Sequence, residues 1–337
     1  MDPVLTSHRA NNFDSMRILA ALAVVFSHSI PLTYGPTQLD ALWSFSQRRA
    51  TLGSVAIQVF FIISGYLITA SYVHTKSPIR FIRARALRLV PALVVVLALL
   101  AFVLGPILTI VPLHEYFRST LPYRAVFGLS DHLPGVFTDN PFSSGIDGSL
   151  WTLRYEALCY FAVLCLGLAG QLKRIAIIPL FCILLGARLY FGGYAALEFG
   201  ALFAAGAVVF LLQPPLKAFF AIPCAVLWIL SMRFGGFTIV SDTAGAYLVI
   251  FLGLSPGLKL PNLAKYGDLS YGVYIYAWPI QQTISLLLGK QATWVINVLI
   301  TVPAALGFAF ASWHLVESPA LRLKDKKLLK IYEPARI

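Results

Sequence analysis

Charged residues are scarce in this sequence, and their scarcity excludes a soluble globular protein. Asp, Glu, Lys and Arg make up 12% of the 337 residues, whereas hydrophobic residues make up 58%. The mean hydropathy is +0.79. A soluble domain carries about 25% charged residues, and the polar stretches here are too short to build one. The composition therefore indicates a polytopic membrane protein.

Acidic residues are scarcer than basic ones, 14 against 26, so that the net charge is +12. Such a surplus can indicate a nucleic-acid-binding protein. Here, however, Lys and Arg lie between hydrophobic runs, as they do in the cytoplasmic loops of membrane proteins. We therefore expect a lipid bilayer as partner and no nucleic acid.

Paired cysteines, a cleavable signal and internal repeats are also missing. The four cysteines lie in apolar stretches without metal-ligand spacing, so we expect neither disulfides nor a metal. The start of the chain lacks the features of a secretory signal, so we expect its first apolar run to be a retained helix. The absence of a repeat argues against transporters that are built from inverted repeats.

The hydrophobic runs predict an all-α membrane bundle of about ten transmembrane helices, because each crossing needs about 20 mostly apolar residues. Residues 1–337 then form a single domain. The predicted spans are 16–33, 53–73, 89–111, 150–169, 175–191, 195–212, 218–232, 244–254, 269–288 and 293–315. Gly235 and Gly236 interrupt the seventh and eighth spans, and the eighth is short enough to be partly re-entrant.

Basic residues in short loops predict the orientation. They gather between the second and third spans and after the last one, so both regions should be cytoplasmic. These residues are Lys76, Arg80, Arg83, Arg85 and Arg88, and then Arg322, Lys324, Lys326, Lys327, Lys330 and Arg336. Ten spans place both termini in the cytoplasm and the long 111–149 connection outside.

The first predicted helix carries a histidine within an apolar run. Arg17 and His28 are eleven positions apart, which places them within roughly 20° of one face and about 16 Å apart along the axis. An ionisable group inside a membrane is a candidate functional residue, and imidazole suits a general base near neutral pH. An idle, hydrogen-bonded histidine at the interface is the alternative. Asp14 is placed to pair with Arg17 at i,i+3.

Two further segments suggest a donor site. The Ser64-Gly65 pair in the second span allows close approach of either another helix or a thin ligand arm. Arg83, Arg85 and Arg88 exceed what orientation requires, and guanidinium groups suit phosphate oxygens. A positive anchor that contacts anionic lipid explains the same arginines.

The remaining candidates lie in the fourth span and near the end of the chain. Arg154 and Glu156 are about 200° apart on a helix, so at least one points into the bundle. Glu156 is placed to orient His28, to position an acceptor hydroxyl, or to pair with an arginine of another span. Aromatic and amide residues suggest an acceptor groove, although an interfacial aromatic belt explains them too; they are Trp151, Tyr271, Tyr274, Trp278 and Gln281. We interpret Glu317 and Pro319 as the end of the last helix.

Five of these segments, in order, resemble the motifs of the acyltransferase-3 family, integral membrane proteins that O-acylate carbohydrates. The motifs are N-F-D-x-x-R with R-x10-H, F-F-x-x-S-G-[FY]-L-I, R-x-x-R-L-x-P, L-W-[ST]-L-x-x-E and S-Y-x-x-Y. They correspond to residues 12–28, 60–68, 85–91, 150–156 and 270–274. The resemblance as a whole extends over nearly the whole chain.

The resemblance implies that His28 is catalytic, that Arg17 is its partner, and that Arg85 and Arg88 lie on the donor side. It implies acetyl-CoA as donor, a polysaccharide or lipid-linked oligosaccharide as acceptor, and the inner membrane of a bacterium as location. Many members place a histidine where this chain has Ala277, so we expect no role for that position. Some members carry a fused extracytoplasmic domain, for which this chain is too short.

A transporter or flippase for a glycan or a lipid-linked sugar is the competing interpretation. It explains the helices and the buried charges, but not a same-face Arg/His pair combined with a cytoplasmic arginine cluster. The sequence leaves open which sugar hydroxyl is acylated, whether transfer is direct or through an acyl-enzyme, and whether the chain forms a homo-oligomer.

Overall fold

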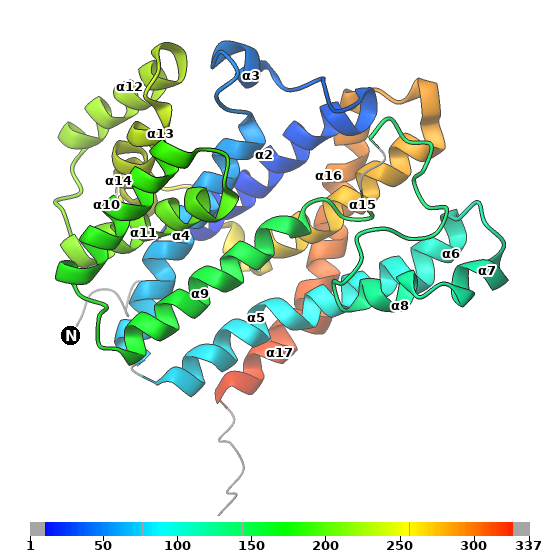
Figure 1. Cartoon of the computed structure of the whole chain (residues 1–337), viewed down its shortest axis with the longest axis horizontal. Coiled ribbons are helices and arrows are strands. Elements are labelled where there is room, and N and C mark those ends of the chain that lie inside the picture. Colours follow the sequence, from blue (N-terminus) through cyan, green and yellow to red (C-terminus); the bar gives the residue numbers. More distant parts are fainter. Residues whose placement is uncertain (1–10, 76, 143–144, 256, 326–337) are drawn as a thin grey trace, which may run out of the picture.

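The computed structural model describes residues 11–75, 77–142, 145–255 and 257–325, and this part of the chain folds into helices without strands. Figure 1 shows long helices packed side by side in one bundle. Each of the ten predicted spans corresponds to a helix, and eight of the helices are long and apolar enough to cross a membrane. The prediction of a polytopic membrane helix bundle is therefore confirmed.

The long helices are numbered in chain order, several of them continued by a π-helical or 3₁₀ turn. They are α2 (Phe13–Tyr34), α4 (Leu52–Thr75), α5 (Pro78–Leu99) with η1 (Leu100–Leu104) and α6 (Gly105–Leu108), η2 (Leu150–Thr152) with α9 (Leu153–Leu168), α10 (Arg174–Phe191), α11 (Ala195–Leu212), α12 (Ala218–Phe234), α13 (Phe237–Val240) with η3 (Ser241–Gly245) and α14 (Ala246–Leu254), α15 (Ser270–Leu288), and α16 (Trp294–Ser312) with η6 (Trp313–Glu317) and α17 (Ser318–Arg322). The connections contain α3 (Ala41–Phe45), α7 (Leu113–Arg118), α8 (Leu121–Val126), η4 (Leu263–Tyr266), η5 (Gly289–Gln291) and η7 (Leu323–Asp325).

Three boundaries differ from the prediction. The third helix begins at Pro78, where proline is tolerated because the first turn lacks internal N–H partners, so the arginines lie on the helix itself. The eighth runs without interruption over 237–254, which is long enough to span a membrane, so the partly re-entrant interpretation was wrong. The last helix does not end at Glu317, because Pro319 lies in the first turn of α17 and the chain stays helical to Arg322.

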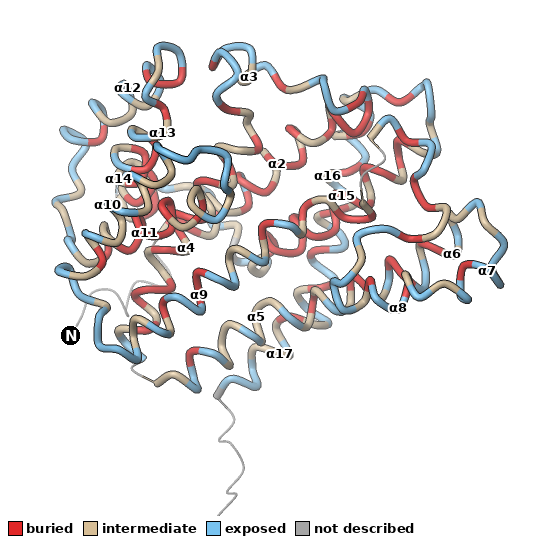
Figure 2. Tube along the Cα trace, viewed as in Figure 1, coloured by how far each residue is buried: buried red, intermediate tan, exposed pale blue. Residues whose placement is uncertain are grey.

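Helix α15 forms the centre of the bundle. Fourteen of its 19 residues are buried, and Figure 2 shows this segment largely in the colour of buried residues. Its polar side chains bond to neighbouring helices: Gln281 Nε2 donates to the carbonyl of Val25 (2.8 Å), and the Ser285 hydroxyl donates to that of Leu32 (3.0 Å). These bonds satisfy polar groups that lipid could not, which explains why the innermost helix is less hydrophobic than those around it.

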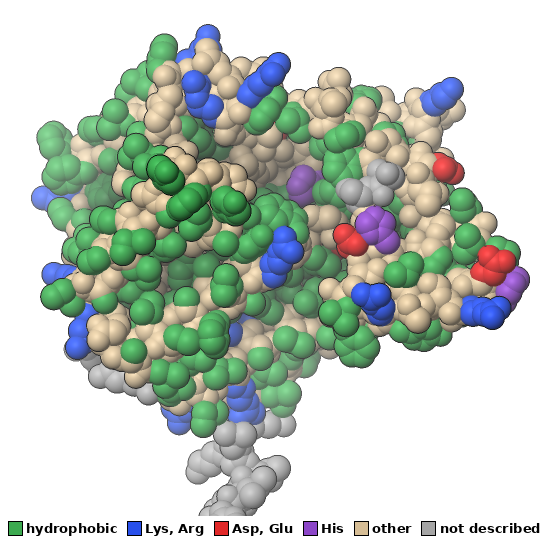
Figure 3. Space-filling view, viewed as in Figure 1, with side chains coloured by type: hydrophobic (Ala, Val, Ile, Leu, Met, Phe, Trp, Pro, Cys, Tyr) green, Lys and Arg blue, Asp and Glu red, His purple; other side chains and the backbone are tan. Residues whose placement is uncertain are grey.

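The outer surface has the pattern expected of a protein in lipid. Hydrophobic side chains spread over the face in Figure 3, while Lys and Arg lie mostly at its margins. Exposed apolar residues are frequent on α10 and α12, among them Ile183, Phe219 and Leu230. These helices cover the inner ones and expose their own apolar sides to lipid.

The predicted basic regions lie on one side of the bundle. Arg83 at the start of α5 donates a hydrogen bond to the carbonyl of Leu323, so α5 begins beside the end of α17, as Figure 1 also shows. Lys76 and the tail from Lys326 onward lie outside the described residues. At the opposite end the long connection packs onto the bundle, where Asn140 Nδ2 donates to the carbonyl of Gln282 (2.9 Å).

Candidate active site

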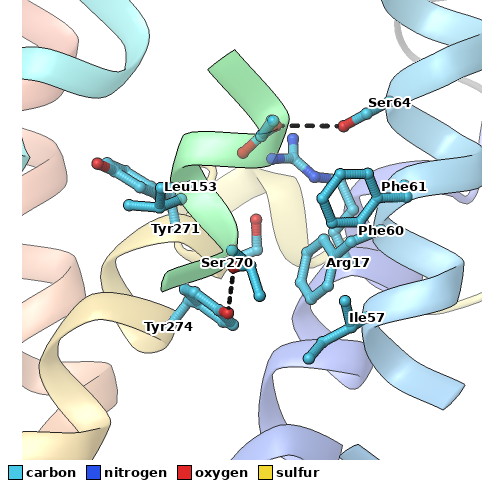
Figure 4. A pocket seen from close by; sticks show the side chains of 11 residues that line it. Arg17, Ile57, Phe60, Phe61, Ser64, Leu153, Ser270, Tyr271 and Tyr274 are labelled. Atoms are coloured by element: carbon cyan, nitrogen blue, oxygen red, sulfur yellow. Dashed lines mark hydrogen bonds between the residues drawn. The ribbon is translucent and has the colours of Figure 1, made fainter. Parts of the chain in front are cut away.

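A cleft lies between α2, α4, α9 and α15, and it brings four of the predicted motifs together. It is lined by Arg17, Ile57, Phe60, Phe61, Ser64, Thr152, Leu153, Glu156, Ser270, Tyr271 and Tyr274. Figure 4 shows Arg17 and Ser64 on one wall and Tyr271 and Tyr274 on the other. The cleft therefore combines a cation, a carboxylate and aromatic walls inside an apolar bundle.

Glu156 is held in this cleft by hydroxyl groups from two helices. Its Oε1 accepts hydrogen bonds from Tyr160 (2.5 Å) on its own helix and from Ser64 (3.3 Å) on α4. Arg154 instead is exposed and lies over the ring of Tyr155, 4.9 Å from its centroid. The prediction that at least one of the two points inward is confirmed, and Glu156 is the one that does.

Arg17 pairs with a carboxylate that the sequence analysis did not single out. Its Nη1 lies 2.9 Å from Asp268 Oδ2, and Arg88 Nη2 lies 2.6 Å from the same oxygen. Burial alone would raise the pKa of Asp268, but the two guanidinium groups lower it below its usual range. Asp268 is therefore an anion that joins α2 and α5 in front of α15. Asp14 lies in the first turn of α2, half-buried, three residues before Arg17.

The three predicted donor-side arginines occupy different environments. Arg88 also forms an ion pair with the almost fully buried Glu317 (2.9 Å), so its charge is used within the protein. Arg85 makes no hydrogen bond or ion pair with a described residue, and its Nε is buried without a partner. It lies close enough to Glu156 and Arg17 to interact with their charges. Arg85 is therefore the arginine best placed to bind an anion beside the cleft.

His28 lies one turn of α15 beyond the cleft. Its ring packs edge-on against Trp278, with 5.0 Å between the ring centroids and an angle of 83°, and Trp278 follows the cleft residue Tyr274 by four positions on the same helix face. The imidazole is half-buried and has no hydrogen bond to a described residue. Arg17 and His28 lie on one continuous helix, α2, so their spacing of eleven keeps them near one face as predicted. Arg17 bonds Asp268 just before α15 begins, and His28 packs on α15. His28 points to protein, not to lipid, but it does not line the cleft itself.

Three predicted site residues lie elsewhere. Gly65 faces α11, where a Cβ atom would overlap the backbone of Phe203, so the structure favours the helix-packing interpretation over the ligand-arm one. Trp151 is 44% exposed and packs against Tyr155. Gln281 is fully buried and bonds to α2. None of the three lines the cleft.

The sequence analysis missed Asp268 and misread Glu317 as a helix end. A usable signal was present, because Asp268 is the single acidic residue between Asp242 and Glu317. Isolated carboxylates in an apolar region need cationic partners, and arginines had already been identified on α2 and α5. Tyr160, which bonds Glu156, follows it by one helical turn and was also detectable by spacing.

Comparison with known proteins gives an independent view of this site. Residues 11–315 match the model of a family described as an acyltransferase domain. The chain is 29% identical to an O-acetyl transferase of Shigella phage Sf6, over 95% of this chain and 99% of that protein. It is 27% identical to nodulation protein 10 of Rhizobium leguminosarum bv. viciae, over 95% of each. No solved structure matches the chain significantly.

Proposed function

Because this chain belongs to the acyltransferase-3 family and is a multi-pass membrane protein, we propose that it transfers an acetyl group from cytoplasmic acetyl-CoA to a hydroxyl of a cell-surface or exported glycan. The name of the phage relative supports acetyl as the group transferred. The resemblance of the five motifs supports a carbohydrate acceptor. Both termini lie in the cytoplasm and the protein resides in the inner membrane of a bacterium under this proposal.

The donor enters at the basic side of the bundle. Coenzyme A carries several phosphates, and Arg83 and Arg85 on the first turns of α5 offer guanidinium groups for them. The buried, unpartnered Nε of Arg85 fits an anionic ligand, because a buried donor without an acceptor is costly. The narrow pantetheine arm then extends into the cleft past Ser64, which lines it.

The chemistry takes place at the His28 end. The acceptor hydroxyl attacks the thioester carbonyl and its proton passes to the imidazole of His28. The C–S bond breaks, coenzyme A leaves as the thiolate, and that thiolate takes up the proton from the imidazolium of His28, which returns to its neutral form. The imidazole can accept the proton because no described residue occupies its ring nitrogens. Arg17 and Glu156 hold opposite charges along the path of the arm.

One observation carries this proposal: the cleft lined by Glu156 and Tyr274 has Arg85 close enough to interact with the charge of Glu156, and the Trp278–His28 pair lies one helical turn beyond Tyr274. A donor on one side of the membrane and an acceptor on the other require such an arrangement. The Arg17–Asp268 and Arg88–Glu317 ion pairs keep the helices around it in fixed positions.

The test uses purified protein in lipid nanodiscs, acetyl-CoA with a labelled acetyl group, and glycan extracted from cells that carry the protein and de-O-acetylated with mild alkali. We expect label on the glycan and release of coenzyme A, and the loss of both with His28→Ala. The same protein is also reconstituted into vesicles. Movement of the glycan across the vesicle membrane without acquisition of label would contradict the proposal and favour a transporter.

A further inference from the structure

Two buried polar atoms, one of them on the indole that packs against His28, have no partner among the described residues. Asp147 is 5% exposed and its Oδ2 makes no hydrogen bond, while Trp278 is 6% exposed and its indole Nε1 makes none. Native proteins rarely leave such atoms unsatisfied, and the exceptions indicate a bound molecule or a functional role. One atom is an acceptor and the other a donor, so a single bridging group could satisfy both.

The two residues are neighbours because Gly148 brings the loop onto the indole. A Cβ atom at Gly148 would overlap Trp278 at Cζ2, Cη2 and Cε2, and Cε2 is the carbon that carries Nε1. The backbone next to Asp147 therefore lies directly against the N–H edge of the ring. Only glycine allows this approach.

The carboxyl of Asp147 is held in place by its other oxygen. Oδ1 accepts hydrogen bonds from the backbone N–H of Ser149 (3.0 Å) and from its hydroxyl (2.5 Å). The hydroxyl of Ser149 in turn lies 3.0 Å from the carbonyl of Tyr274 on α15. Asp147 thus has one oxygen bonded to the protein and one oxygen without a hydrogen-bond partner among the described residues.

The position of this pair matches the proposed chemistry. His28 packs against the same indole, and the connection that carries Asp147 closes over the end of the bundle away from Arg83 (Figure 1). An alcohol is both a donor and an acceptor, so one hydroxyl can donate to Asp147 and accept from Trp278. Such a hydroxyl would lie beside the imidazole.

We propose that Asp147 and Trp278 form an acceptor subsite that binds a hydroxyl of the glycan beside His28. This inference rests on the proposed function and adds a carboxyl to it that the sequence analysis did not assign. Burial raises the pKa of Asp147 to about 7, although the bonds from Ser149 oppose the shift. Near neutral pH the carboxyl therefore exists in both forms and can accept or donate a hydrogen bond.

The test compares Asp147→Asn and Trp278→Phe with the unchanged protein in the labelled-acetyl assay, using the de-O-acetylated glycan as acceptor. Asparagine keeps an oxygen for Ser149 but replaces the carboxyl oxygen at the subsite by an NH₂ group. Phenylalanine keeps an aromatic ring and removes Nε1. The matched control is Asp131→Asn, which changes an exposed carboxyl of the same connection.

We expect both variants to raise the KM for the glycan about tenfold or more. The KM for acetyl-CoA should stay within twofold of the control, and neither melting temperature should fall more than about 2 °C below that of the control. An unchanged KM for the glycan would overturn the inference and leave water as the partner of the two atoms. Equal damage to both KM values would also overturn it, by showing a structural role. If the unchanged protein transfers no label, the proposed function fails before the variants are compared.

Discussion

The guanidinium of Arg17 and the carboxylate of Asp268 lie 2.9 Å apart, although 251 positions separate them in the sequence. The ion pair joins the first helix to the segment that leads into the central helix α15. Arg88 on α5 contacts the same carboxylate oxygen at 2.6 Å. Asp268 therefore fixes, relative to one another, two arginines that belong to different motifs.

Replacing Asp268 by Asn should destabilise the protein markedly. Two largely buried guanidinium groups would lose their shared counter-charge, and breaking such a pair typically costs about 3–5 kcal/mol. The measurement is thermal unfolding in detergent, and the control is Asp131→Asn, whose carboxyl is exposed. A melting temperature for Asp268→Asn equal to that of the control would show that the network contributes nothing to the fold.

Gly65→Ala should prevent normal packing of α4 on α11. The added methyl group would overlap the carbonyl of Phe203, and the helices meet again one turn away, where a Cβ at Gly206 would overlap the carbonyl of Ile62. Overpacking of this kind costs about 1–3 kcal/mol or more. We expect a lower melting temperature and less protein extracted in folded form. Gly307→Ala on α16, where the space is open, should leave both unchanged, and equal behaviour of the two variants would refute the packing argument.

Arg85→Ala should weaken donor binding without unfolding the protein. Its guanidinium has no hydrogen bond to a described residue, so its removal breaks no internal hydrogen bond, whereas loss of a charged hydrogen bond to a phosphate costs about 1.5–3 kcal/mol. We expect the KM for acetyl-CoA to rise about tenfold or more, with Arg85→Lys intermediate. Arg80→Ala, exposed on the same helix, serves as the control. A donor KM that rises equally in both variants would indicate a general charge effect at the membrane surface.

The buried carboxyl of Asp147 should make stability depend on pH. The folded pKa of Asp147, about 7, lies above that of an unfolded aspartate. The stability that the protonated carboxyl gives to the fold is therefore fully present below about pH 4 and is lost as the pH rises through 7. We expect the melting temperature to fall more between pH 5 and pH 8 in the unchanged protein than in Asp147→Asn. Parallel curves for the two proteins would show that the carboxyl of Asp147 ionises in the fold as it does in the unfolded chain.

The sequence was sufficient to locate a helix at each of the ten predicted spans, although the eighth span, 244–254, was shorter than its helix, 237–254. It was also sufficient to predict that at least one of Arg154 and Glu156 points inward, because two charges about 200° apart on a helix cannot both face lipid without cost. That Glu156 is the one that does so came from the structure. Helix ends were harder to predict. Pro78 and Pro319 look like breaks, but in a first turn proline removes no hydrogen bond.

The partners of the charged residues could not be read from the sequence. Asp14 at i,i+3 was the local candidate for Arg17, and the structure adds Asp268, from a segment 251 positions away, as an ion-pair partner. Spacing along one helix says nothing about a carboxylate that packing brings in. Gly65 shows the same limit, because its sequence neighbours do not reveal whether a helix or a ligand occupies the space above a glycine.

His28→Ala should abolish acetyl transfer while the protein stays folded. The ring makes no hydrogen bond to a described residue, so its removal breaks none and loses the contact with Trp278, yet under the proposed function it is the group that accepts the hydroxyl proton. We expect a fall of at least about 100-fold in kcat with an unchanged KM for acetyl-CoA, as for loss of a general base. The measurement is label transfer in nanodiscs, with His132→Ala, an exposed histidine, as control. Undiminished transfer by folded His28→Ala would show that another residue accepts the proton, and Glu156 in the cleft would be tested next.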